Sequence, residues 1–108
     1  RFLASEIIRE KVFEFYGEEI PYSTTVEIEE FKEREAGKDF IKAIIYVERE
    51  SQKGIIIGKD GKAIKHVGLI AREEIEKEIG RKVYLELLVK VIEKWRKDKS
   101  KLYKLGYK

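Results

Sequence analysis

A Gly-x-x-Gly turn at Gly58–Gly61 constrains the fold of this chain more than any other feature. It follows three isoleucines at residues 55–57 and precedes a helical pattern of apolar residues. Two glycines three residues apart permit a tight, partly left-handed backbone that side chains would block. Because the second glycine opens a helix, unpaired backbone N–H groups point toward the turn and favour phosphate there. The pattern therefore predicts a turn between two helices that holds a nucleic-acid backbone.

Hydrophobic periodicity predicts the remaining elements. The short polar segment around Gly37 favours a hairpin, and Ser51 is a candidate N-cap. The last strand has a wholly apolar face, so we expect it to lie deepest in the sheet. The expected helices cover residues 2–16, 51–57, 61–79 and 95–105, and the expected strands cover 24–32, 40–48 and 82–91. This order predicts one α+β domain over residues 1–108, with strands in one layer and helices in the other.

Two helices show clear apolar stripes. The helix at 61–79 contains Gly68 within its stripe, which indicates a close approach of another backbone. The first helix places apolar residues at spacings of three and four, which assigns to the core Ala4, Ile8, Val12, Phe15 and Tyr16.

Charge is unevenly distributed along the chain. The formal net charge is +3, but residues 1–50 carry 8 basic and 13 acidic side chains, whereas residues 90–108 carry 8 basic and 2 acidic. The acidic first half argues against a protein that coats nucleic acid indiscriminately, and the basic remainder permits a local footprint.

The absence of cysteine excludes disulfides and thiol chemistry and is compatible with the cytoplasm, where we place the protein. No run of about 18 apolar residues is present, so no membrane span is expected. The chain starts at Arg1 without an initiator Met or a signal-peptide pattern, so we expect it to be a piece of a longer protein.

The motifs of enzymes and cofactor sites do not fit. A nucleotide-binding P-loop needs four residues between Gly and Gly-Lys, then Ser or Thr, but only three separate Gly54 from Gly58 and an acidic residue follows Lys59. His66 is the only histidine, so a zinc site lacks its usual ligands, and no Ser or Thr stands in the context of a nucleophile. We therefore expect no catalysis, no metal and no cofactor.

The residues around the turn supply the chemistry of an RNA site. Backbone N–H groups of Gly58–Gly61 would hold phosphates, and lysines would add positive charge, which the acidic side chain at position 60 weakens. Three isoleucines would offer an aliphatic platform to bases, although each also fits a core position. His66 would stack on a base or form a hydrogen bond with it, and we expect no aromatic side chain in the groove near the motif. The predicted RNA-binding residues are Ile56, Ile57, Gly58, Lys59, Asp60, Gly61, Lys62, Ile64, Lys65 and Lys53.

The string from Ile56 to Val67 resembles the core motif of the KH domain: two aliphatic residues, Gly-x-x-Gly, two variable residues, Ile-Lys and an apolar position. Further strings resemble the C-terminal domain of the bacterial Era GTPases, at residues 1–11, 17–23, 51–59, 83–87 and 105–107. The resemblance spans nearly the whole chain. It implies a type II KH fold, with a three-stranded mixed sheet and helices on one face.

The same resemblance implies a function and partners. Such a domain binds single-stranded RNA at the 3′ end of small-subunit ribosomal RNA during ribosome assembly, so the small ribosomal subunit is a partner. It is normally joined to an N-terminal GTPase domain. The sequence holds no P-loop, so we expect this chain to bind RNA and to hydrolyse nothing.

Other functions remain open at this point. In a protein-interaction or structural domain, the glycine turn would be only a connection between helices, and the acidic first half would be the partner surface. A reader of double-stranded DNA would use the helix at 61–79, although the acidic residues beyond Arg72 would repel phosphates. The basic segment at 94–104 permits association with a membrane surface.

Overall fold

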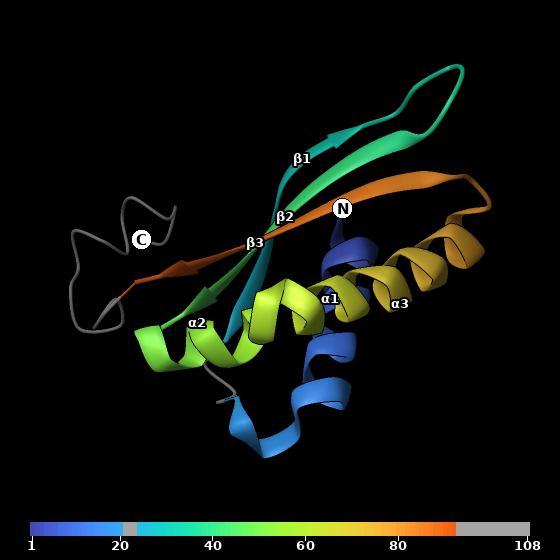
Figure 1. The fold of residues 1–108 in the computed structure, drawn as a ribbon. Helices are drawn as coiled ribbons and strands as arrows, with labels where there is room; N and C mark the ends of the chain where they lie inside the picture. The colour runs from blue at the N-terminus through green and yellow to red at the C-terminus, as the bar shows by residue number, and fades with distance from the viewer. Residues whose placement is uncertain (21–23, 93–108) are drawn as a thin grey trace.

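The computed structural model describes residues 1–20 and 24–92, and these residues have the expected α+β architecture (Figure 1). The observed bounds lie within one residue of the expected ones, and the helix expected at 95–105 lies outside the described residues. In chain order the elements are α1 (Phe2–Tyr16), β1 (Thr25–Lys32), β2 (Asp39–Val47), α2 (Glu50–Ile57), α3 (Lys62–Ile79) and β3 (Val83–Val91), with short 3-10 turns at Gly17–Glu19 and Lys59–Gly61.

The strands form one mixed sheet in the order β1-β2-β3. β1 and β2 are antiparallel, with one register shift, which confirms the hairpin expected around Gly37. β2 and β3 are parallel and pair along their whole length. Since a parallel pair needs a crossover connection, the chain must travel back between them, and it does so through α2, the turn and α3.

The expectation that the last strand lies deepest is wrong. β2 is the central strand, and its alternate residues from Ile41 to Val47 are at most 1% exposed. β3 is an edge strand, and Leu85 and Leu87 are only partly buried. The face of β3 is thus apolar because it lies toward the helices, and not because the strand is central in the sheet.

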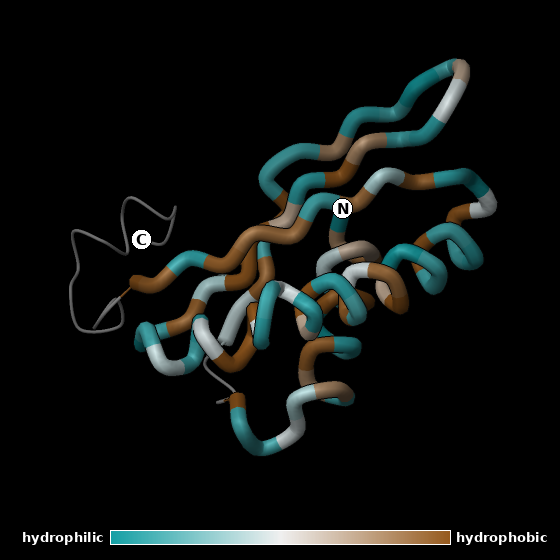
Figure 2. Tube along the Cα trace, viewed as in Figure 1, coloured by the Kyte–Doolittle hydropathy of each residue, from teal (hydrophilic) through white to brown (hydrophobic). Residues whose placement is uncertain are grey.

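All three helices cover the same face of the sheet (Figure 1), and hydrophobic residues concentrate where the two layers meet (Figure 2). α3 contributes Val67, Ala71 and Ile75 to this core, as its apolar stripe predicts. α1 contributes most of its predicted stripe, but Phe15 is 46% exposed, so its assignment to the core is wrong. Phe15 lies at the border of the stripe, where the helix surface turns toward solvent.

Charged side chains are paired at the end of the sheet where β2 and β3 begin. Asp39 is 1% exposed, and its carboxylate oxygens accept hydrogen bonds from Nε and Nη2 of Arg81 at 2.8 and 2.7 Å. The backbone N–H of Arg34 donates to the same carboxylate at 3.1 Å. The hydrogen bond from Arg81 is the main cause that lowers the pKa of Asp39 below its ordinary value. This network ties the hairpin to the start of β3.

Candidate nucleic-acid interface

The start of α2 is capped by Gln52. Its amide oxygen accepts the backbone N–H groups of Glu48 and Arg49, each at 3.0 Å. These donors would otherwise be orphaned at the helix start. The expectation that Ser51 is the N-cap is therefore wrong, because the helix begins one residue earlier and encloses it.

The end of α2 is held by Tyr16 of α1. The hydroxyl of this buried tyrosine donates to the carbonyl oxygen of Ile56, one of the carbonyls that a helix end leaves without an intrahelical partner. Burial raises the pKa of Tyr16 to about 12. This contact fixes the chain two residues before the glycine turn, so α1 supports the turn from below.

The turn itself has the left-handed backbone that its glycines predict. Gly58 has φ 74° and ψ 178°, and a Cβ atom there would lie 2.6 Å from Cβ of Ala63. Gly61 has φ 73° and ψ 13°, and between them Asp60 has φ 55°. Asp is one of the few residues other than Gly that tolerate this conformation. The local shape therefore requires glycine at position 58 for space as well as for φ.

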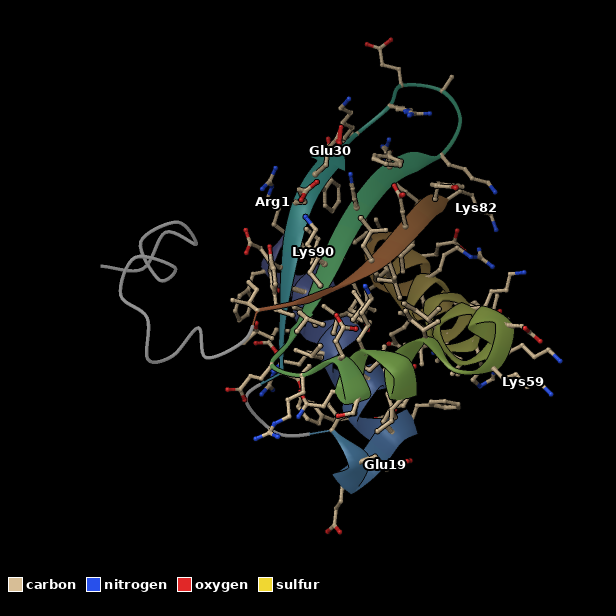
Figure 3. All side chains as sticks on the ribbon, turned by 60° about the vertical axis from the view of Figure 1, so that its left-hand side comes forward. Arg1, Glu19, Glu30, Lys59, Lys82 and Lys90 are labelled. Carbon is tan, nitrogen blue, oxygen red and sulfur yellow. The ribbon has the colours of Figure 1, made fainter. Side chains whose placement is uncertain are left out.

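The lysines around the turn are free to meet a ligand. Lys59, Lys62 and Lys65 are exposed and Lys53 is half-buried. None of the four forms an ion pair with any residue in the ranges 1–20 and 24–92. Lys59 points away from the helical layer (Figure 3). Within the same ranges no side chain caps the N-terminus of α3, although the backbone N–H groups of Gly61 and Lys62 already donate to the carbonyl oxygens of Gly58 and Lys59.

A groove of about 330 Å³ runs beside the turn between α3 and β3. Its wall on α3 follows helical spacing, and its wall on β3 is formed by alternate leucines. The sequence prediction included only two of the lining residues. The groove is lined by Ile64, Lys65, Gly68, Leu69, Arg72, Leu85 and Leu87. The signal that could have found the others is the step of three or four residues from Ile64 and the period of two on the strand.

Gly68 forms part of the groove wall instead of a close backbone contact. A Cβ atom at this position would meet only Cδ1 of Leu87, at an ordinary distance of 3.6 Å. The expectation of a close backbone approach is therefore wrong. The missing side chain leaves space between α3 and β3, which a flat group could occupy.

Arg72 is held in place at the far end of the groove. Its Nη1 donates to both carboxylate oxygens of Glu76 at 3.1 Å. Glu76 also accepts the backbone N–H of Val83 at 2.8 Å, and this bond is the main cause that lowers the pKa of Glu76. The guanidinium of Arg72 is thus oriented by a carboxylate that is itself bonded to the first residue of β3. The donors of Arg72 other than Nη1 take no part in this contact.

The three predicted platform isoleucines have different environments. Ile56 is 0% exposed and belongs to the core, so its prediction as an RNA contact is wrong for the side chain. Its side chain packs in the core, while its carbonyl oxygen accepts the hydrogen bond from Tyr16. Ile57 is partly buried against the core, and Ile64 opens into the groove. Only Ile64 therefore has the position of an aliphatic platform.

No aromatic residue is among the described residues that line the groove, as the sequence predicts, but an aromatic ring lies outside the groove beside His66. The ring of Phe15 is 5.1 Å from the ring of His66, between centroids. Sequence reasoning missed Phe15 because the helix packing, and not the local sequence, brings α1 beside the first turns of α3. Both residues are exposed.

Other site types find little support in the described part of the chain. Among residues 1–20 and 24–92, no group of three or more His, Cys, Asp or Glu side chains is arranged to hold a metal ion. No helix in those ranges is long and apolar enough to cross a membrane.

The model of the KH domain matches residues 19–96, which include the turn, the helices on both sides of it and all three strands. The chain belongs to the KH domain family. The glycine turn corresponds in sequence to the Gly-x-x-Gly loop with which KH domains clamp about four nucleotides of backbone. The strand order and the position of the turn within the crossover are those expected for the type II arrangement.

Relatives and solved structures extend the similarity to the whole chain. The KH domain is 58% identical to GTPase Era of Thermotoga maritima over 108 residues and 56% identical to GTPase Era of Geobacter metallireducens. These matches cover 99% of this chain but only 36% of the relatives, so the chain spans about a third of their length.

Two solved structures have the same fold with a TM-score of 0.85 and 46% identity, again over 99% of this chain and 36% of theirs. One is an Era variant of Aquifex aeolicus bound to GDP and aluminium fluoride. The other is Era in complex with MgGDPNP and nucleotides 1506–1542 of 16S ribosomal RNA.

Proposed function

We propose that this KH domain binds single-stranded RNA, with phosphates on the turn at 58–61 and bases in the groove between α3 and β3. The proposal rests on the position of the turn beside the groove. A left-handed turn with an uncapped helix start and unpaired lysines opens directly beside an apolar groove of about 330 Å³. The turn suits phosphates, and the groove suits bases.

The phosphate part of the site uses main chain and charge together. A phosphate at the N-terminal end of α3 would lie where the helix dipole favours an anion. Lys59 and Lys62 flank that point without a competing carboxylate partner among the described residues. Asp60 is exposed within the same turn and limits the number of phosphates that can approach.

The base part of the site is narrow and mostly apolar. A base that enters over Gly68 would lie against Ile64 on one side and Leu87 on the other. Arg72, oriented by Glu76, would present its remaining N–H donors to a base edge. These contacts suit an unstacked base, which single-stranded RNA presents and a duplex does not.

We infer that the target is the 3′ end of small-subunit ribosomal RNA, on the small ribosomal subunit in the cytoplasm. Support comes from the Era structure that holds nucleotides 1506–1542 of 16S ribosomal RNA and shares this fold at 46% identity. We further propose that the chain is the C-terminal part of an Era-type GTPase, because relatives that are nearly three times longer carry that name. Nucleotide hydrolysis would then belong to the N-terminal part of the parent protein.

The test is titration of fluorescently labelled RNA with the sequence of nucleotides 1506–1542, monitored by anisotropy at two salt concentrations. A clamp on about four phosphates predicts a slope of log affinity against log salt of about −3, at ~0.7 per phosphate. Lys59→Asp should weaken binding at least about tenfold and make the slope shallower. Lys77→Asp, which makes the same charge change at the other end of α3, is the matched control and should bind as the unmodified chain does.

Circular dichroism and thermal melting establish that both variants are folded. If folded Lys59→Asp bound RNA as tightly as Lys77→Asp, the turn would not be the clamp. Binding without salt dependence, or equal binding of a duplex, would favour a protein-interaction or structural domain instead.

A further inference from the structure

Phe15 and His66 form an exposed aromatic pair beside the glycine turn but outside the groove. Their ring centroids are 5.1 Å apart, with planes inclined by 45°. Phe15 comes from the last turn of α1, and His66 comes from the second turn of α3. Neither residue lines the groove between α3 and β3.

Phe15 has a packing partner within the protein although it faces solvent. The ring of Phe15 packs edge-on against the ring of Tyr16, at 5.0 Å and 88°. Tyr16 is buried and bonded to the carbonyl of Ile56. Phe15 is 46% exposed, so a large apolar surface stays in water at a fixed position. A fixed and exposed ring can stack on a flat ligand without first losing conformational freedom.

Positive charge adjoins the pair on the side of the turn. Lys62 lies four residues before His66, on the same face of α3, and is exposed. It forms no ion pair with a described residue. On the side away from the turn, Glu73 follows on α3 and Glu14 precedes Phe15 on α1. The surface that suits nucleic acid therefore extends from the turn by the length of about one nucleotide and then ends.

We propose that Phe15 and His66 are a stacking subsite for the base of the nucleotide next to the clamped segment, with its phosphate on Lys62. The inference rests on the proposed RNA-binding function and adds one nucleotide to it. The RNA would pass over the turn so that bases on one side enter the groove and the next base lies on the opposite side of α3. Stacking on rings accepts any base, so this subsite adds affinity without reading sequence.

The experiment compares a short RNA that fills the clamp with the same RNA extended by one 2-aminopurine nucleotide, at its 5′ or its 3′ end. With the unmodified chain, one of the two extensions should raise affinity about fivefold, the lower limit for stacking of one base on an aromatic side chain. The fluorescence of the 2-aminopurine should be quenched on binding. An extension that carries an abasic nucleotide should give no such gain.

Two variants test the residues. His66→Ala changes an exposed side chain, and Phe15→Leu keeps an apolar residue on α1 while it removes the ring. Both should abolish the fivefold gain and the quenching, and both should bind the unextended RNA as before. Phe2→Ala, which removes a ring that is 77% exposed at the other end of α1, is the control and should retain the full gain.

The two proposals fail in different ways. Tight and salt-dependent binding of the unextended RNA, with no gain from either extension, would overturn the subsite alone. The same holds if the gain persisted in both folded variants. Absence of salt-dependent binding to every RNA would overturn the proposed function and the subsite with it.

Discussion

The two ends of α3 use charge in opposite ways. At its C-terminal end, Glu76 holds the backbone N–H of Val83, and close by the carboxylate of Asp39 is paired with Arg81. At its N-terminal end, lysines surround the turn without a carboxylate partner among the described residues. Paired charges fix strands and helices to one another, whereas unpaired charges are available to bind a ligand. The difference separates the part of the fold that maintains geometry from the part that meets RNA.

The same contrast appears in the backbone. Both strands at the paired end are regular and in register. At the turn, three residues in a row of four have positive φ. Glycine adopts positive φ readily, so only Asp60 bears a conformational cost in this turn. Four predictions test this contrast, beginning with the largest expected loss of stability.

Gly58→Ala should have the largest effect on stability. Its φ and ψ are accessible almost only to Gly, and the new methyl group would meet Ala63 at 2.6 Å, so we expect a loss of about 3 kcal/mol in the free energy of unfolding. Gly61→Ala is the matched variant, because its Cβ would meet open space, and it should lose about 1 kcal/mol. Urea unfolding measures both. Equal losses would show that crowding at Ala63 contributes nothing.

Tyr16→Phe should lower the free energy of unfolding by about 1–2 kcal/mol at neutral pH, because the carbonyl of Ile56 loses its partner. The pKa of Tyr16 is raised in the folded state to about 12, from 10. Stability is therefore fully retained below pH 10 and falls as the pH rises from 10 to 12. The loss is at most about 2–3 kcal/mol over that window. The variant should lack this part of the decline, as unfolding measured between pH 9 and 12 would show.

Arg81→Gln should destabilise the paired end and leave RNA binding unchanged. The exposure of the Arg81 side chain, at 46%, limits the loss, but the buried carboxylate of Asp39 keeps the backbone N–H of Arg34 in place of the full network. Since Arg81 lowers the pKa of Asp39, the stabilisation is present above the ordinary pKa near 4 and is lost as the pH falls below it. The difference in melting temperature between the variant and the parent should therefore be smaller at pH 3 than at pH 7. Weaker RNA binding by this variant at pH 7 would contradict the separation of the two ends.

Gly68→Ala should have the smallest effect on stability and a visible effect on binding. Alanine favours the helix by up to about 1 kcal/mol, and the neighbouring Leu87 leaves room for a methyl group. Thermal melting should therefore show an unchanged or slightly higher midpoint. The methyl group would narrow the groove, so affinity for single-stranded RNA should fall severalfold. Unchanged affinity would mean that bases do not enter between α3 and β3.

Local patterns in the sequence were sufficient for the elements and for the turn. The steps of three and four in α1 and α3, the hairpin around Gly37 and the two glycines are each decided by neighbouring residues. The resemblance to the KH domain supplied the mixed sheet. These predictions depend on short-range chemistry, and the structure confirms them.

The errors concern contacts between distant segments. The wholly apolar face of β3 was interpreted as burial, but the strand borders a groove at the sheet edge. The sequence left open whether Ile56 is a base platform or a core residue, and the packing of α2 against the other elements places it in the core. Phe15 was assigned to the core, and its neighbour His66 was considered alone. In each case the deciding partner lies on another element, where periodicity carries no information.

The parallel pairing of β2 with β3 has a consequence for the resistance of the molecule to proteolysis. The chain must cross back through α2 and α3, and the glycine turn lies in the middle of that crossing. It is thus the only covalent path from the hairpin to β3, in a chain without cysteine. A single protease cut there would leave two fragments joined only by packing and strand pairing. An RNA bound to the turn would shield its peptide bonds from the protease. Resistance to proteolysis should therefore rise with the fraction of the protein that has RNA bound.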